Sequence, residues 1–173
     1  MSQHLYILTG ASRGMGLAMA RQLLQPGHSL VCISRQANAE LAQAARAADV
    51  PLAQWTQDLA DGEGASERLH RWLAEQAPGQ WRSATLINNA AALPRIAPLS
   101  QTHVHDLATV LRVGLEAPMQ LCAAFLGATE GWGVPRRVLN ISSGLGRRAM
   151  ASQSAYCAVK AGMDHFTRCL ALE

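Results

Sequence analysis

The sequence predicts an α/β fold in which one parallel sheet is covered by helices on both faces. Two observations support this prediction. Short apolar segments alternate with longer segments of helical periodicity along the chain, which is the pattern of βαβ units in a doubly wound sheet. The 173 residues are 49% hydrophobic and 16% charged, a composition that can bury one core in a single domain over residues 1–173.

The expected elements alternate between strands and helices in chain order. The predicted strands are residues 4–8, 28–34, 51–57, 84–87 and 137–142. The predicted helices are residues 14–25, 38–48, 65–76, 101–126 and 152–172. A kink is expected in the fourth helix at Pro118, because proline lacks a backbone N–H.

Composition indicates neither a nucleic-acid partner nor a membrane partner. The net charge is only +3, and no run of basic residues suggests a nucleic-acid groove. No uninterrupted apolar stretch reaches the roughly 18 residues of a membrane span. Four cysteines without a CxxC pair are expected to be buried free thiols of a reducing, cytoplasmic protein: Cys32, Cys122, Cys157 and Cys169. No metal site is expected.

Three glycines follow the first predicted strand, in the segment TGASRGMG. We expect Gly10 to allow a tight turn, Gly14 to let the backbone approach a pyrophosphate, and Gly16 to let the helix pack against the strand. The free N–H groups of the helix N-terminus would bind phosphate. The turn therefore predicts a Rossmann-like dinucleotide-binding domain, although its GxxxGxG spacing differs from the commonest fingerprint.

TGASRGMG and the later segment Asn88-Asn89-Ala90-Ala91 together resemble the short-chain dehydrogenase/reductase family, in which the second segment usually reads NNAG. Asp58-Leu59 resembles the family's contact to the adenine ring, although an Asp there could equally cap a turn. The resemblance covers nearly the whole chain. It implies nicotinamide dinucleotide binding by Gly10, Ser12, Arg13, Gly14, Met15, Gly16, Ser34, Arg35, Asp58, Leu59, Asn89, Ala90, Ala91, Tyr156 and Lys160.

The residues after the second strand indicate which nicotinamide cofactor is bound. NAD enzymes usually carry Asp or Glu about 20 residues beyond the glycine turn. Here the stretch reads SRQAN and contains no acid before Glu40. The resemblance places Arg13 and Arg35 beside the adenosine ribose, where arginine can pair with the 2′-phosphate. NADP(H) is the expected cofactor.

Tyr156 and Lys160 form a YxxxK pair on one face of the last predicted helix. A nearby ammonium favours the phenolate and lowers a phenol pKa from its usual value of about 10, which suits acid–base catalysis. The family's catalytic Ser lies thirteen residues before the Tyr, which matches Ser143, with Ser142 as the weaker alternative. The resemblance implies that Tyr156 protonates a carbonyl oxygen, Ser143 hydrogen-bonds that oxygen, and Lys160 assists Tyr156 and holds the nicotinamide ribose.

Two features depart from the family pattern. Gly114 stands where the family usually carries a catalytic Asn on its central helix, and a glycine inside a helix is expected to mark a local kink. The sequence stops at Glu173, where family members continue into a sixth strand, a substrate lid and a seventh strand. The expected fold is therefore truncated after the fifth strand and the Tyr/Lys helix.

The expected function is NADP(H)-dependent reduction of a carbonyl, or oxidation of an alcohol, in a small molecule. The alternative is a truncated family member that binds NADP(H) or a partner without efficient catalysis. Trp132 is the one tryptophan considered for a substrate contact. A homo-oligomer, dimer or tetramer, is expected, because the family's central helix and Tyr/Lys helix commonly form its dimer interface.

Overall fold

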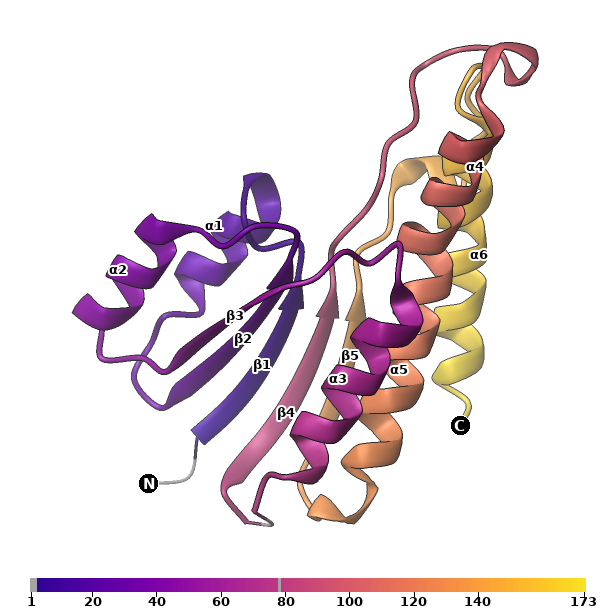
Figure 1. Cartoon of the computed structure of the whole chain (residues 1–173). Helices are drawn as coiled ribbons and strands as arrows, with labels where there is room; N and C mark the ends of the chain where they lie inside the picture. The colour runs from indigo at the N-terminus through magenta and orange to yellow at the C-terminus, as the bar shows by residue number, and fades with distance from the viewer. Residues whose placement is uncertain (1–2, 78) are drawn as a thin grey trace.

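Five parallel strands form one sheet in a computed structural model that describes residues 3–77 and 79–173. The strand order is β3-β2-β1-β4-β5, so the chain crosses from β3 at one edge to β4 beside β1 (Figure 1). The strands are β1 (Gln3–Thr9), β2 (His28–Ser34), β3 (Leu52–Thr56), β4 (Trp81–Asn88) and β5 (Arg136–Asn140). The predicted parallel α/β fold is confirmed.

Helices cover both faces of the sheet (Figure 1). Helices α1 and α2 lie on one face, and α3, α5 and α6 lie on the other. The helices are α1 (Gly14–Gln22), α2 (Ala39–Ala47), α3 (Gly62–Ala74), α4 (Val104–Leu111), α5 (Ala117–Ala128) and α6 (Ser154–Leu170).

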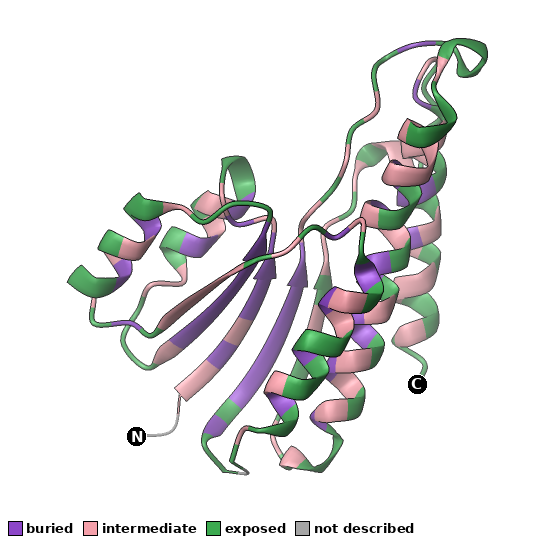
Figure 2. Cartoon of the chain, in the orientation of Figure 1, coloured by how far each residue is buried: buried purple, intermediate pink, exposed green. Residues whose placement is uncertain are grey.

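The core is split by the sheet into two clusters. Along β1, Leu5 and Ile7 point to the cluster under α3 and α5, whereas Leu8 points to the cluster under α1 and α2. This alternation follows from the two-residue period of a strand. Figure 2 shows buried residues along the central strands and exposed residues on the outer helix faces. The carboxyl ends of β1 and β2 are therefore held by burial on both sides.

Local polar groups explain where several helices begin and end. Helix α3 begins three residues before its predicted start, because the Asp61 side chain accepts a hydrogen bond from the N–H of Gly64 at 3.0 Å. Helix α2 is capped by Asn38, which accepts from the N–H of Leu41 at 2.8 Å. Helix α1 ends at Gln22, earlier than predicted, shortly before Pro26, since the residue before a proline avoids helical geometry.

The predicted helix 101–126 is divided into α4 and α5 by a π-helical turn, Arg112–Glu116. Pro118 follows within the first turn of α5. Its missing N–H leaves the carbonyl of Gly114 without the usual i→i−4 donor, which favours a local break before the proline. The irregularity thus lies one turn before the kink predicted at Pro118 and includes Gly114.

Segment Val104–Trp132 satisfies the length and composition of a membrane span, because an 18-residue stretch of it has a mean hydropathy of 1.2. Half of that stretch is buried within the fold, and Leu121 and Phe125 of the segment pack into the core. At its end, the Trp132 ring stacks on Trp81, with centroids 6.5 Å apart. Trp81 begins β4, so Trp132 lies at the amino ends of the strands, and the substrate contact considered for it stays a prediction.

Candidate functional site

The glycine turn after β1 has the tight geometry that its sequence predicts. Gly10 and Gly14 have positive φ angles of 72° and 56°, a region that favours glycine. A Cβ on Gly16 would lie 2.1 Å from the carbonyl oxygen of Gly10, so only glycine fits where α1 crosses the turn. Around Gly14, apart from its chain neighbours and the backbone of α1, no described atom lies within 4 Å of a Cβ position, which leaves room beside the backbone.

Side chains from two neighbouring strand ends brace this turn. The Asn89 amide donates to the carbonyl oxygens of Thr9 and Gly10 at 3.0 and 3.3 Å. The Thr9 hydroxyl accepts from the backbone N–H groups of Asn89 and Ala90, both at 3.0 Å. The Ser34 hydroxyl accepts from the N–H of Ala11 at 2.9 Å. The turn is therefore preorganised by the protein's own polar groups.

The N-terminus of α1 is open to an anion. Its N-cap is Arg13, whose side chain makes no capping hydrogen bond, and its first turn contains no acidic residue. The first N–H groups of a helix have no intrahelical acceptor and carry the positive end of the helix dipole. A phosphate would supply acceptors for these groups.

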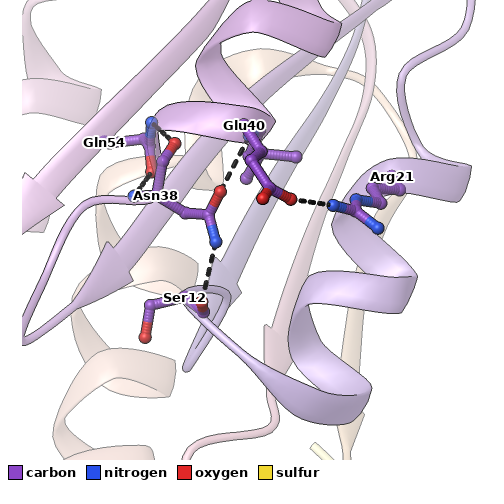
Figure 3. Close-up of polar contacts among 6 residues, drawn as sticks. Ser12, Arg21, Asn38, Glu40 and Gln54 are labelled. Atoms are coloured by element: carbon purple, nitrogen blue, oxygen red, sulfur yellow. Dashed lines mark hydrogen bonds and ion pairs between the residues drawn. The ribbon is translucent and has the colours of Figure 1, made fainter.

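Asn38 fastens the loop after β2 to the glycine turn (Figure 3). Its side-chain amide donates to the carbonyl of Ser12 at 3.0 Å, and its backbone exchanges two hydrogen bonds with the Gln54 side chain, at 2.7 and 3.0 Å. The loop that Asn38 holds begins with Arg35. Sequence reasoning used Asn38 only as a helix start; its strong preference for N-cap positions was the signal for a positioning role.

The first acid after β2 is engaged elsewhere. The Glu40 carboxylate pairs with the Arg21 guanidinium at 2.6 Å, across α2 and α1 (Figure 3). Arg13 and Arg35 are exposed at the glycine turn and the end of β2. The charge presented beside the turn by these two arginines is therefore positive.

A cavity of about 730 Å³ runs along the carboxyl ends of β1, β2 and β4. Every predicted nucleotide-binding residue except Tyr156 and Lys160 lines it. The lining consists of Gly10, Ser12, Arg13, Gly14, Met15, Gly16, Ile33, Ser34, Arg35, Gln36, Gln57, Asp58, Leu59, Asn89, Ala90, Ala91, Ala92, Thr109 and Val113.

Two details of this lining bear on the sequence predictions. Asp58 lines the cavity and also caps a turn, which was the alternative role considered for it. Its carboxylate accepts a hydrogen bond from the N–H of Ala60 at 2.9 Å. Thr109 and Val113, from α4 and the π-turn, were missed, since nothing local to them signals a cavity. Such a cavity at the point where the strand order reverses is the usual ligand position in an open α/β sheet.

Tyr156 and Lys160 lie on α6, and Ser143 lies three residues after the end of β5, as the N-cap of the short 3-10 turn Gly144–Gly146. The Lys160 ammonium is 5.7 Å from the centroid of the Tyr156 ring. The described residues Ser143, Tyr156 and Lys160 lie outside the cavity lining. The structure thus groups Tyr156 with Lys160 as predicted and places both beyond the nucleotide cavity.

Lys160 is 4% exposed, and its ammonium donates to the carbonyl of Ile141 at 2.7 Å. Burial lowers the pKa of Lys160 from its ordinary value, and the negative charge of Asp164 opposes this shift. The Ser143 hydroxyl accepts from the N–H of Leu145 at 3.2 Å. Lys160 therefore holds the end of β5 as well as facing Tyr156.

The π-turn lies against α6 at Gly114. A Cβ on Gly114 would lie 2.6 Å from Cγ1 of Val159, the residue before Lys160. Val159 is buried, so its side chain fills the space into which a residue at position 114 would project. This packing is the physical reason that the chain accommodates glycine where the family usually carries Asn.

A chain of side-chain amides links the neighbouring strands to α6. The Asn88 amide donates to Asn140 Oδ1 at 2.9 Å, and the Asn140 amide donates to the Thr167 hydroxyl at 2.9 Å. These bonds connect β4, β5 and α6 at the level of the strand ends. Sequence reasoning assigned Asn88 to the NNAA segment but did not anticipate its partners, which are distant in sequence.

The cysteines divide by burial. Burial raises the pKa of Cys32 to about 12 and that of Cys122 to about 11, so both thiols stay protonated. Cys157 is partly buried and Cys169 is exposed, so the expectation of buried thiols is wrong for Cys169. Within residues 3–77 and 79–173, no group of three or more His, Cys, Asp or Glu residues is placed to hold a metal ion.

Comparison with known proteins finds relatives in one family, the short-chain dehydrogenases/reductases. The family model described as short chain dehydrogenase matches residues 4–173. Benzil reductase of Bacillus cereus is 34% identical over 167 residues, which cover 96% of this chain and 67% of that protein. The chain spans about two thirds of the length of the curated relatives it matches.

Solved structures extend the likeness to the fold. A short-chain dehydrogenase/reductase from Burkholderia vietnamiensis superposes with a TM-score of 0.86 at 33% identity, covering 99% of this chain and 80% of that one. A metagenomic short-chain oxidoreductase solved with NADP has a TM-score of 0.86 at 27% identity, covering 98% and 74%. A more distant neighbour was solved with NAD.

Proposed function

This chain belongs to the short-chain dehydrogenase/reductase family of oxidoreductases, and we propose that it reduces the carbonyl group of a small molecule with NADPH. Family membership supports a nicotinamide dinucleotide as cofactor. The choice of NADP(H) over NAD(H), and the carbonyl or alcohol substrate, are our proposal.

The observation that carries the cofactor proposal is the charge around the cavity. Arg13 and Arg35 line the cavity. The first acid after Arg35 in the sequence, Glu40, is paired with Arg21. Two guanidinium groups can form charge-assisted hydrogen bonds with a ribose 2′-phosphate, whereas a carboxylate there would repel it. The open N-terminus of α1 and the space beside Gly14 suit the pyrophosphate.

The residues on α6 and after β5 supply the proton chemistry of the proposal. NADPH, when bound, supplies the hydride that reduces the carbonyl carbon. We assign Tyr156 as the donor of the proton to the substrate oxygen, and Ser143 as the hydrogen-bond donor to that oxygen as negative charge develops. Lys160, held by Ile141, supplies positive charge beside the phenol.

The names of relatives support a carbonyl substrate. Benzil reductase and L-xylulose reductase are both named for the reduction of carbonyl compounds. We extend that reaction class to this chain. A cytoplasmic location and assembly as a homo-oligomer are further parts of the proposal.

Titration of the chain with NADPH and NADH, followed by an assay with a panel of ketones and aldehydes, tests the proposal. We expect NADPH to bind more tightly than NADH and to be consumed with at least one carbonyl substrate. Binding without turnover would instead favour a binding role for this chain. Failure to bind NADPH would overturn both.

A further inference from the structure

The segment that follows β5 is attached to α6 at consecutive residues. The Lys160 ammonium binds the Ile141 carbonyl at 2.7 Å, and the Ser142 hydroxyl donates to the Asp164 carboxylate in a short hydrogen bond. Lys160 and Asp164 are one helical turn apart, so they lie on the same face of α6. Two neighbouring residues of the segment are therefore bound by two neighbouring residues of that face.

Packing confirms how closely the segment approaches the helix. A Cβ on Gly146 would lie 2.8 Å from Oδ2 of Asp164 and 2.9 Å from the carbonyl oxygen of Lys160. The turn Gly144–Gly146 thus rests on α6 with no room for a side chain at Gly146. Ser143, the proposed catalytic serine, lies between the Ser142 bond and this close contact.

We infer that Asp164 is a positioning residue: through Ser142 it holds the segment that carries Ser143 against the helix that carries Tyr156 and Lys160. This inference rests on the proposed function, which assigns Ser143 and Tyr156 to the same substrate oxygen. Those two side chains come from different elements, the segment after β5 and α6, so their spacing depends on the contacts between the segment and α6. Misplacement of a reacting group by about 1 Å costs up to roughly 100-fold in rate.

Asp164 has a second effect that a purely structural residue would lack. Its negative charge raises the pKa of Lys160 against the lowering by burial. The other charged or titratable side chains on α6 and the elements packed on it are Tyr156, Cys157, His165, Arg168 and Cys169 on α6, Arg147 and Arg148 after the turn, Arg112 and Glu116 on the π-turn, and His105 and Asp106 on α4. These side chains remain unchanged in the Asp164 variants below. A shift of the pH–rate profile in those variants can therefore be attributed to the loss of the Asp164 charge.

The test compares Asp164→Ala, which removes both the bond and the charge, with Asp164→Asn, which keeps an acceptor for Ser142 and removes only the charge. We expect Asp164→Ala to reduce kcat about 10- to 100-fold. Asp164→Asn should retain most of kcat at neutral pH. In both variants the basic limb of the pH–rate profile should move to lower pH, because loss of a negative charge makes nearby protons easier to remove.

Ser142→Ala removes the same hydrogen bond from the other side and keeps the charge of Asp164. It should reduce kcat about 3- to 10-fold, the range expected for loss of one hydrogen bond, without moving the pH profile. Glu67→Gln removes an exposed acid on α3, remote from α6, and is the matched charge control. It should change neither kcat nor the pH profile.

Hydrogen–deuterium exchange at the amides of residues 145–147 supplies a readout that does not require turnover. Faster exchange there in Asp164→Ala and Ser142→Ala, with NADPH affinity unchanged, would support the inference even if the chain reduced no carbonyl in the panel. Unchanged exchange and an unchanged pH profile in Asp164→Ala would overturn it, and would do so without affecting the evidence for reductase activity in the unsubstituted chain.

Discussion

The two halves of the site differ in how they are held. In the β1–β2 half (β1, β2, α1 and the glycine turn), strand residues such as Leu5, Ile7 and Leu8 are fully buried, and side-chain hydrogen bonds to the backbone brace the turn. In the β5–α6 half (β5, residues 141–146 and α6), every residue of β5 is partly or fully exposed, and Leu139 is 49% exposed. There, side-chain hydrogen bonds from Asn140, Ser142 and Lys160 connect the strand end to α6.

This difference teaches that the two halves of one small sheet depend on burial to different extents, although polar contacts brace both. Burial on two faces, close glycine packing and the hydrogen bonds of Asn89 and Ser34 define the shape of the nucleotide cavity before any ligand arrives. Polar groups define the relative position of Ser143, Tyr156 and Lys160, because little apolar area is available beside β5. Substitutions in the two halves should therefore affect cofactor binding and catalysis unequally.

Tyr156→Phe is expected to have the largest effect, and to change turnover far more than NADPH affinity. Loss of the phenol proton should reduce turnover by about 10²–10⁴-fold, the usual contribution of general acid–base catalysis. NADPH affinity should be nearly unchanged, because Tyr156 lies outside the cavity lining. Steady-state rates and a fluorescence titration measure the two quantities. Turnover equal to that of the unsubstituted chain would remove Tyr156 from the proposed mechanism.

Substitution of Gly16 should damage the β1–β2 half most. A Cβ there would lie 2.1 Å from the Gly10 oxygen, so Gly16→Ala should cost about 1–3 kcal/mol of unfolding free energy and also weaken NADPH binding. Gly14→Ala is the matched comparison, because its Cβ position is open and its cost arises from the positive φ. Denaturant titration should show the smaller loss for Gly14→Ala; an equal loss would contradict the packing argument.

Arg35→Ala tests the charge of the cavity. Loss of a charge-assisted hydrogen bond should weaken NADPH binding about 10- to 100-fold and leave NADH binding nearly unchanged, because NADH has no 2′-phosphate. Arg46→Ala, an exposed arginine at the end of α2 outside the cavity lining, is the control. Parallel titrations with both cofactors check this. An equal effect on NADH would mean that Arg35 does not recognise the 2′-phosphate.

Gly114→Asn places the family's usual residue on the π-turn, where it faces Val159 of the β5–α6 half. We expect a loss of about 1–3 kcal/mol in unfolding free energy, because the new side chain would meet Val159 Cγ1 at 2.6 Å. The double variant Gly114→Asn, Val159→Ala should recover part of the loss relative to the sum of the single variants. Strictly additive losses in a thermodynamic cycle would show that Val159 does not occupy that space.

The smallest expected effect is the pH dependence that Lys160 confers on stability. Because its pKa is lowered in the folded protein, the unfolded chain binds more protons between that value and 10.5. Stability should therefore rise with pH across that window, relative to a Lys160→Met variant, and the gain should be lost as pH falls. Urea unfolding of both proteins at several pH values measures the difference, and a constant difference would contradict the burial argument.

Much of the β1–β2 half could be predicted from local sequence. The glycine spacing, the apolar alternation and the lack of an acid between Ser34 and Glu40 are properties of short segments. Every cavity residue proposed from TGASRGMG, Asp58-Leu59 and Asn89-Ala90-Ala91 lines the cavity in the structure. The contributions of Thr109 and Val113 could not be predicted, because they depend on how the π-turn packs.

The β5–α6 half was predictable only in part. Tyr156 and Lys160 are related by helix periodicity, which is visible in sequence. The bonds of Lys160 to Ile141 and of Ser142 to Asp164 join residues 19 and 22 positions apart, and no local pattern signals them. The local kink expected at Gly114 is confirmed by the π-turn, whereas the kink expected at Pro118 lies one turn earlier, since the proline's missing N–H acts on the preceding turn.

The sequence by itself determined the strand and helix alternation, the glycine turn and the Tyr/Lys pair, because each depends on backbone preferences or on residues a few positions apart. Only the tertiary structure decided which side chains brace these features: Asn38 on the glycine turn, Val159 against Gly114, and Asp164 on Ser142. Such contacts form between surfaces that folding brings together. Their partners are chosen by the packing of whole helices on the sheet, which local sequence does not encode.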